Sequence, residues 1–263
     1  MAEQTSSEAF TLLSWNIDGL DKRDTIRRAQ AVCKLISSRR PHAVFLQEVV
    51  PSTEMEILKS LGADYDYYSA PGAGERYGYY VAILVLKTKG LLFRDNMMCI
   101  DLPETVMGRH VLFCTVVFGG VEINLLTSHL ESMKDYGGPR KAQLSKVFEI
   151  ISENPTWIFG GDLNIRDHEV KSVGLPADTV DVWEACGSIE DEKFTWDVSK
   201  NDNLQWTYPN KPKCRFDRVY LHSKDGGVRA KGFGLVGKER LEDCGRFPSD
   251  HWGLWMELSV DRS

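Results

Sequence analysis

Long apolar runs are missing from this chain of 263 residues, as are internal repeats, low-complexity tracts and Pro/Gly/Ser-rich linkers. No stretch approaches the roughly 20 consecutive apolar residues that a membrane-spanning helix needs. Residues 1–10 have neither the basic nor the apolar segment of a secretory signal, so we expect none. The content of 42% hydrophobic and 27% charged residues is typical of soluble globular proteins and excludes disordered and collagen-like classes.

An excess of basic residues is also absent. The chain has 32 Lys and Arg against 38 Asp and Glu, which leaves a net charge of −6. This balance excludes a uniform electrostatic attraction to nucleic acid, so any such contact must be local. The six cysteines form no Cys-x-x-Cys pair, which argues against a zinc ribbon or a redox motif. Because their density is low, we expect them to be reduced and mostly buried.

Apolar strand-like runs alternate with helical patterns along the chain, which indicates an α/β domain rather than an all-β sandwich. We expect a loose tail over residues 1–9, followed by one domain over residues 10–263. Strands are expected at residues 10–15, 42–46, 79–86, 111–118, 121–125, 157–160, 215–221 and 254–260. Helices are expected from Ile26 to Pro41 and from Leu144 to about Pro155.

Five short segments share one feature, an apolar strand that runs directly into carboxylate, amide or imidazole side chains. They are Ser14–Leu20, Leu46–Val49, Thr127–Ser132, Gly160–Asp167 and Ser249–Trp252. Each segment alone is explained as well by a turn, a surface charge or a structural histidine. Five of them together are harder to dismiss, because α/β folds usually place their sites at strand ends.

The order Trp-Asn, Gln-Glu, Ser-His, Gly-Asp-x-Asn and Ser-Asp-His in these segments resembles the endonuclease/exonuclease/phosphatase superfamily, which is related to DNase I. The resemblance extends from Phe10 to Val260. It implies a four-layer α/β/β/α sandwich, in which two mixed β-sheets pack together and helices flank them. It also implies that residues 10–263 are the catalytic domain.

Longer strings are similar to one branch, the tyrosyl-DNA phosphodiesterases. They are Trp15–Asp21, Thr127–Ser132, Phe194–Asp197, Arg215–Arg218 and, most specifically, Cys244–Gly253. This resemblance implies hydrolysis of the bond between a trapped topoisomerase II tyrosine and a 5′ DNA end, which leaves a 5′-phosphate for repair. The implied partners are DNA with a 5′-phosphotyrosyl end, single-stranded or overhanging, a topoisomerase II-derived peptide and tyrosyl-linked RNA. We expect a monomer without membrane contact, located in the nucleus and also in the cytoplasm.

The phosphodiester substrate explains why carboxylates are needed. Its negative charge repels a water nucleophile, and the leaving oxygen gathers charge as the bond breaks. Mg²⁺ relieves both problems, because it binds carboxylate oxygens and phosphate oxygens together. By the resemblance, Glu48 is the direct Mg²⁺ ligand, while Asp18 and Asp250 supply further ligands, directly or through water. Mn²⁺ is the expected substitute.

The resemblance also assigns roles in the chemical step. Asp162 is the expected general base for the attacking water, with Asn164 beside it on the same turn. The amide of Asn16 is expected to hold Asp162 or a phosphate oxygen. His251 is expected to stabilise transition-state charge on the phosphate, with Asp217 fixing its tautomer and raising its pKa.

Binding of a DNA end needs apolar faces for bases and a few cations for the backbone. By the resemblance, the residues expected to bind the substrate are His129, Ser132, Arg166, Arg109, Tyr79, Trp196 and Phe216. Most aromatic residues of such a chain lie in the core, so a core role is the competing interpretation of the last three. We expect Arg27 and Arg28 on a solvated helix face, and Lys211, Lys213 and Arg215 as a local basic rim.

Three alternatives remain open at this stage. Gly161–Arg166 and Asp217–Arg218 also resemble phosphoinositide 5-phosphatases, and the superfamily includes apurinic endonucleases. The third alternative is a non-catalytic nucleic-acid-binding module that kept the fold. It is disfavoured, because Asn16, Glu48, Asp162 and His251 are all present.

Overall fold

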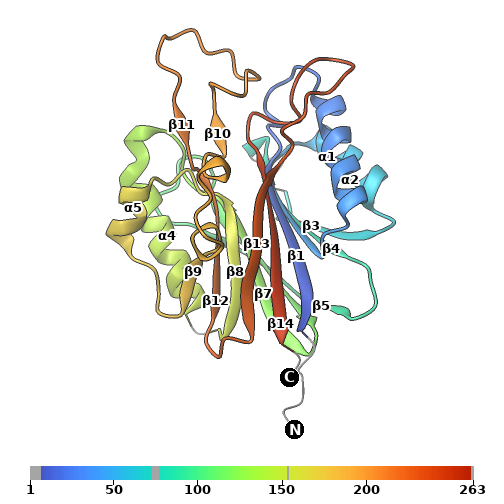
Figure 1. The fold of residues 1–263 in the computed structure, drawn as a ribbon, viewed down its shortest axis with the longest axis vertical. Coiled ribbons are helices and arrows are strands. Elements are labelled where there is room, and N and C mark those ends of the chain that lie inside the picture. The colour runs from blue at the N-terminus through green and yellow to red at the C-terminus, as the bar shows by residue number, and fades with distance from the viewer. Residues whose placement is uncertain (1–6, 73–76, 153, 262–263) are drawn as a thin grey trace.

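Two six-stranded β-sheets form the centre of the protein, as seen in a computed structural model that describes residues 7–72, 77–152 and 154–261 (Figure 1). The first sheet has the order β13 (Val228–Val236), β14 (Gly253–Asp261), β1 (Ser7–Asn16), β2 (Ala43–Val49), β4 (Tyr80–Leu86), β3 (Tyr65–Ser69). The second has the order β5 (Leu91–Asp101), β6 (His110–Phe118), β7 (Val121–His129), β8 (Thr156–Asp162), β12 (Asp217–Ser223), β9 (Thr179–Asp181). A separate two-stranded sheet pairs β10 (Trp196–Asp197) with β11 (Lys213–Cys214).

Both large sheets are mixed, because β1 runs parallel to β2 and β7 parallel to β8, while their other pairs are antiparallel. Helices α1 (Thr25–Arg39) and α2 (Pro51–Leu61) lie outside the first sheet. Helices α4 (Gly137–Ile151) and α5 (Asp167–Val173) lie on the outer side of the second (Figure 1). The short helix α6 (Val182–Ala185) contacts β9, β12 and β13, and its Val182 packs in the cluster between the sheets. Short 3₁₀ turns follow at Lys134–Tyr136 and Glu190–Glu192. The predicted four-layer α/β/β/α sandwich is therefore confirmed.

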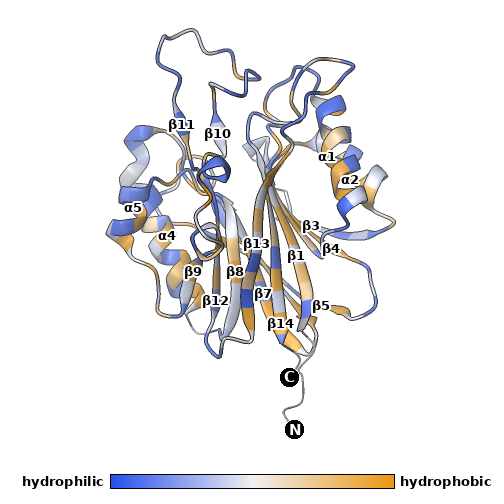
Figure 2. Cartoon of the chain, in the orientation of Figure 1, coloured by the Kyte–Doolittle hydropathy of each residue, from blue (hydrophilic) through white to orange (hydrophobic). Residues whose placement is uncertain are grey.

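Three buried clusters hold these layers together. Leu12 of β1 packs between the two sheets with Leu125 of β7. The next residue, Leu13, faces the opposite way and packs with Val32 and Ile36 of α1. The third cluster lies between the second sheet and α4. Because central strands are covered on both faces, they are rich in apolar residues, and apolar segments dominate several strands in the middle of the molecule (Figure 2).

Several sequence expectations need correction. Strand β1 begins at Ser7, so residues 7–9 of the predicted tail belong to the sheet, while residues 1–6 lie outside the described residues. Of the cysteines, Cys33 and Cys114 are buried, three are partly buried and Cys99 is exposed, so the expectation of mostly buried thiols was wrong. In the part of the chain that the structure describes, no helix has the length and apolar content needed to cross a membrane.

The topology brings the polar strand ends to one edge. Asn16 pairs with Gln47 at the end of the parallel β1–β2 pair, and His129 pairs with Asp162 at the end of β7–β8. Asp217, at the start of β12, lies opposite Asp162. This edge is at the top of Figure 1, where hydrophilic loops gather (Figure 2).

Candidate active site

Glu48 lies near the end of β2, in an irregularity that shifts the pairing with β4 between Leu46 and Val49. Its φ of 55° is in the left-handed region, and its half-buried side chain meets the end of β1. There, Asn16 Nδ2 donates to Glu48 Oε1 at 3.1 Å and to Asp162 Oδ2 at 2.9 Å. One amide group therefore joins the expected metal ligand to the expected base.

Asp162 ends β8 and is buried among hydrogen-bond donors. Besides Asn16, the backbone N–H of Asn164 donates to its Oδ1 at 3.0 Å. Burial opposes ionisation, but the imidazoles of His129 and His251 and the Asn16 amide favour the carboxylate, so the pKa of Asp162 lies below its usual value. An ionised carboxylate in a fixed orientation suits a general base.

His251 is held by a buried carboxylate from another strand. Its Nδ1 lies 2.7 Å from Asp217 Oδ2, and its Nε2 lies 3.8 Å from Asp162 Oδ2. Burial lowers the pKa of His251, but Asp217, Asp250 and Asp162 outweigh it and raise that pKa well above its usual value. The contact between Asp217 and His251 that the resemblance implies is therefore present, and the imidazolium form is favoured.

The pKa of His129 is shifted in the opposite direction. Burial lowers its pKa to about 3, with a further contribution from the Arg109 cation, so the imidazole is neutral at ordinary pH. Its Nε2 lies 3.3 Å from Asp162 Oδ2. A neutral imidazole protonated at Nε2 donates to this carboxylate, so His129 contacts the expected base directly.

Beside His129, Tyr79, Arg109 and Ser132 form a cationic and aromatic wall, which we call the Arg109 wall. Tyr79 meets His129 edge to face, with ring centroids 6.1 Å apart. The Arg109 guanidinium lies 5.3 Å from the Tyr79 ring centre and donates to Ser132 Oγ at 3.4 Å. These contacts connect four of the expected substrate-binding residues, including His129.

On another side, Trp196 and Phe216 form an aromatic wall. Their ring centroids are 5.7 Å apart, and neither ring is fully buried. Trp206 continues the contact, with its ring 6.2 Å from Trp196, and exposed Tyr208 follows at 5.6 Å from Trp206. Trp206 and Tyr208 were not predicted from the sequence, although both are aromatic and lie in the loop that joins β10 to β11.

Arg166 and Asn164 lie on the turn after β8. The Arg166 guanidinium sits 5.5 Å from the Phe216 ring centre and donates to the Asn164 carbonyl at 3.3 Å. Asn164 has a φ of 49°, and its amide donates to the Leu130 carbonyl at 3.4 Å. The backbone of Asn164, rather than its side chain, therefore contacts Asp162.

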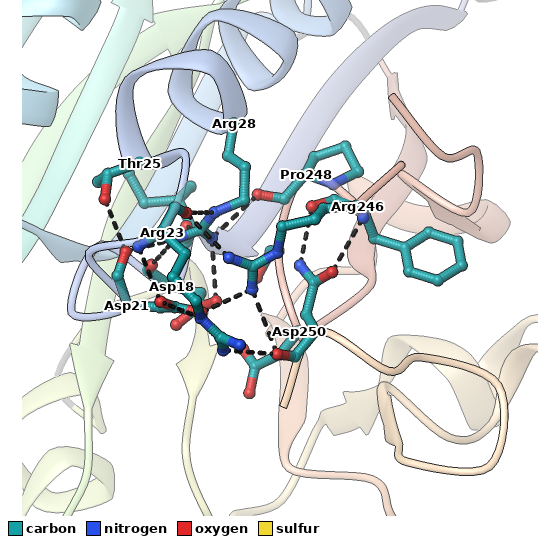
Figure 3. A network of polar contacts seen from close by, with 12 residues as sticks. Asp18, Asp21, Arg23, Thr25, Arg28, Arg246, Pro248 and Asp250 are labelled. Atoms are coloured by element: carbon teal, nitrogen blue, oxygen red, sulfur yellow. Dashed lines mark hydrogen bonds and ion pairs between the residues drawn. The ribbon is translucent and has the colours of Figure 1, made fainter. Parts of the chain in front are cut away.

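A buried arginine holds the acidic loop after β1 (Figure 3). Arg28 Nη1 lies 2.9 Å from Asp18 Oδ2, and Nη2 donates to the carbonyls of Asp18 and Asp21 at 2.8 and 2.7 Å. Arg28 is fully buried, so its expected place on a solvated helix face was wrong. Burial and the neighbouring Asp250 raise the pKa of Asp18 to about 7, against the effect of Arg28.

The donors present fit a hard divalent cation. Burial and the charges of Asp250 and Asp18 raise the pKa of Glu48 to about 8, so these carboxylates repel one another. Among the described residues, however, the ligand atoms of Glu48, Asp18 and Asp250 do not all lie within 4.8 Å of one another. A cation among them would relieve this repulsion, and carboxylate oxygens are the ligands Mg²⁺ prefers. Glu48, His129 and Asp162, by contrast, bring ligand atoms within 4.8 Å of one another. Asp250 further accepts from Trp196 Nε1 at 3.2 Å.

A sequence profile of the Endonuclease/Exonuclease/phosphatase family matches residues 13–251, a span that contains most of these groups. The chain belongs to this family. Tyrosyl-DNA phosphodiesterase 2 of Xenopus laevis is 40% identical over 264 residues, which cover 98% of this chain and 68% of that protein. The Homo sapiens protein of the same name is 39% identical over 264 residues, 98% of this chain and 70% of its own length.

Solved structures agree with this membership. D. rerio TDP2, complexed with single-strand DNA product, is 37% identical with a TM-score of 0.88, over 95% of this chain and 99% of that one. TDP2 from C. elegans is 38% identical with a TM-score of 0.84, over 96% and 75% of the two chains. A family protein of Bacteroides thetaiotaomicron shares the fold, with a TM-score of 0.75 at 18% identity.

Contacts connect all the expected site residues into one group, from Asp18 through Asn16 and Asp162 to both walls. The expected basic rim is wrong for Arg215, which is buried in an ion pair with Asp181. Sequence analysis also missed Thr195, whose hydroxyl accepts from the backbone N–H of Asp217 at 3.1 Å and so fixes the partner of His251.

Proposed function

We propose that this chain is a Mg²⁺-dependent 5′-tyrosyl-DNA phosphodiesterase. The observation that carries the proposal is the position of Asp162, which is bound by Asn16 and lies between a neutral His129 and a cationic His251. This arrangement suits hydrolysis of a phosphodiester. Relatives that cover nearly the whole chain are named tyrosyl-DNA phosphodiesterase 2, which favours a phosphotyrosyl bond as the target.

In the proposed reaction, water attacks the phosphorus and the bond from phosphorus to the tyrosyl oxygen breaks. The products are a 5′-phosphate and a tyrosyl phenolate, which takes up a proton from solvent to give tyrosine. Glu48, with Asp18 and Asp250, would hold Mg²⁺, which when bound neutralises charge on phosphate oxygens. Asp162 accepts the proton of the attacking water. The His251 imidazolium donates to the phosphate as negative charge builds up on it.

The aromatic wall supports a DNA end as the bound substrate. Trp196 and Phe216 offer partly exposed rings beside the catalytic group, and Arg166 places a cation over Phe216. Because the chain carries a net charge of −6, stacking must supply much of the affinity. We therefore propose single-stranded or overhanging 5′ ends as ligands, linked to a topoisomerase II-derived peptide, and the corresponding tyrosyl-linked RNA as a further substrate. We also propose that the protein is a monomer and that it acts in the nucleus and the cytoplasm.

The test is incubation of the chain with a 5′-phosphotyrosyl oligonucleotide, with and without Mg²⁺, followed by electrophoresis. We expect a Mg²⁺-dependent shift to the mobility of a 5′-phosphate oligonucleotide, lost in the Asp162→Asn variant. Parallel reactions contain a soluble inositol phosphate or a duplex with an abasic site. Faster turnover of either one would replace the proposal with a phosphoinositide phosphatase or an apurinic endonuclease. Binding of DNA without any turnover would indicate a non-catalytic module.

A further inference from the structure

Glu131 is a fully buried carboxylate in the loop after β7, outside the catalytic group described above. Its Oε1 accepts from the backbone N–H groups of Val106 and Met107, at 3.1 and 2.9 Å. Its Oε2 accepts from Thr105 Oγ1 and from Gln143 Nε2, both at 3.0 Å. Four donors thus converge on one side chain, which ties the β5–β6 loop to the end of β7.

Thr105 connects Glu131 to Arg109, one of the residues expected to bind the substrate. The backbone N–H of Arg109 donates to Thr105 Oγ1 at 2.7 Å, and the Thr105 hydroxyl donates in turn to Glu131 at 3.0 Å. A hydroxyl has a single hydrogen, so Thr105 can accept from Arg109 and donate to Glu131 at the same time. The position of the Arg109 backbone is therefore coupled to the Glu131 carboxylate.

Only a carboxylate satisfies this arrangement. All four partners of Glu131 are donors, and an ionised carboxylate accepts at both oxygens. Glutamine at position 131 would direct an NH₂ group either at the Val106 and Met107 amides or at Thr105 and Gln143. Either orientation sets donors against donors inside the protein, where an unmade hydrogen bond is expensive.

The loop that Glu131 holds leads directly into Arg109, the cation of the Arg109 wall. Arg109 Nη2 lies 3.4 Å from Ser132 Oγ and 3.3 Å from Met107 Sδ, and its guanidinium covers Tyr79. Met107, Arg109, Tyr79 and His129 line one recess of the surface. Among the described residues, no hydrogen bond joins the Glu131 or Thr105 side chain to Glu48, Asp162 or His251.

We propose that Glu131, acting through Thr105, is a positioning residue that sets the Arg109 wall for the substrate. This inference rests on the proposed function, because it concerns the affinity for the phosphotyrosyl DNA end. The Glu131 carboxylate and the Thr105 hydroxyl bond the β5–β6 loop and Gln143 rather than Glu48, Asp162 or His251, so we expect their loss to affect substrate binding far more than the chemical step. KM should therefore change, while kcat and the Mg²⁺ concentration for half-maximal rate stay near their wild-type values.

The experiment compares Thr105→Val with Thr105→Ser on a 5′-phosphotyrosyl oligonucleotide. Valine keeps the shape and removes both hydrogen bonds, whereas serine keeps the hydroxyl. We expect Thr105→Val to raise KM about tenfold, the effect of roughly one to two lost hydrogen bonds, with kcat within about twofold of wild type. Thr105→Ser should behave like the wild type. Glu131→Gln should raise KM at least as much, and adding Thr105→Val to it should have little further effect.

Three results would overturn the inference. They are a wild-type KM in Thr105→Val, equal losses in the valine and serine variants, or a fall in kcat with KM unchanged. The last result would place Glu131 and Thr105 in the chemical step. If Glu131→Gln does not fold, the comparison of Thr105→Val with Thr105→Ser still tests the inference. A wild-type chain without phosphotyrosyl turnover would refute the proposed function and the inference together, whereas an active wild type with an unchanged Thr105→Val variant refutes only the inference.

Discussion

Gly19 lies against the backbone of Glu48, so a methyl group added there must displace the expected metal ligand. A Cβ on Gly19 would sit 2.2 Å from the Glu48 carbonyl oxygen and 3.3 Å from Val50 Cγ1. An ordinary contact starts at 3.4 Å, so the backbone at Glu48 has to yield by about 1.2 Å. Little can absorb this shift, because Glu48 is held in a left-handed conformation and bonded to Asn16.

The Gly19→Ala variant should therefore lose activity out of proportion to its loss of stability. Overpacking of this kind costs about 1–3 kcal/mol of unfolding free energy. A displacement of about 1 Å at a reacting centre can lower the rate roughly 10²-fold. We expect a fall in kcat/KM of that size and a higher Mg²⁺ concentration for half-maximal rate.

Steady-state kinetics over a Mg²⁺ series, together with urea unfolding, measures both effects. Gly234→Ala is the matched control, because a Cβ at Gly234 meets nothing within 4 Å. It should keep wild-type kinetics. If Gly19→Ala keeps wild-type kcat/KM and Mg²⁺ dependence, activity does not depend on the position of Glu48, and the prediction from the close contact is wrong.

Three further predictions follow from the same site. Asp162→Asn should lower kcat by roughly 10²–10⁴-fold while DNA binding is retained, as single-turnover kinetics and a binding titration would show. Arg28→Met removes the buried cation from the half-buried Asp18 carboxylate and should cost about 3–5 kcal/mol in urea unfolding, whereas exposed Arg27→Met should cost almost nothing. Trp196→Ala should weaken binding of a tyrosyl oligonucleotide by about 1–3 kcal/mol without changing the dependence on salt, and a changed salt slope would argue against stacking.

Much of the site could be predicted because its residues are local in sequence. Each motif follows a strand, and parallel strands such as β1 and β2 bring their ends to the same edge. Asn16 beside Gln47, and His129 beside Asp162, follow from that geometry. The two-sheet sandwich came from family resemblance, since apolar periodicity does not tell which strands share a sheet.

Arg28 shows what the sequence analysis overlooked. It precedes Val32 and Ile36 by four and eight residues, and such positions share one face of a helix. Both of those residues are buried, so the arginine lies on the covered face with them. The spacing could have revealed this, but its carboxylate partner, Asp18, lies in a loop whose path no periodicity describes. Thr105 and Glu131 were missed for the same reason, since their contact joins two loops.

Strands β3, β5 and β13 were also missed. Most of their residues are only partly buried and many are polar, as in Tyr65–Ser69 and Val228–Val236. Such edge strands lack the continuous apolar runs that identified the central ones. Their places depend on pairing with distant partners, which is a tertiary effect.

The proposal that water attacks the phosphorus of a phosphotyrosyl bond is tested most directly by turnover of a 5′-phosphotyrosyl oligonucleotide in H₂¹⁸O with Mg²⁺. Both products are then analysed by mass spectrometry. Attack of water on phosphorus predicts one ¹⁸O atom in the DNA 5′-phosphate and none in the released tyrosine. The Asp162→Asn variant should yield the same labelling at a much lower rate. Label in the tyrosine, or no Mg²⁺-dependent release of tyrosine from the wild-type chain, would contradict the account.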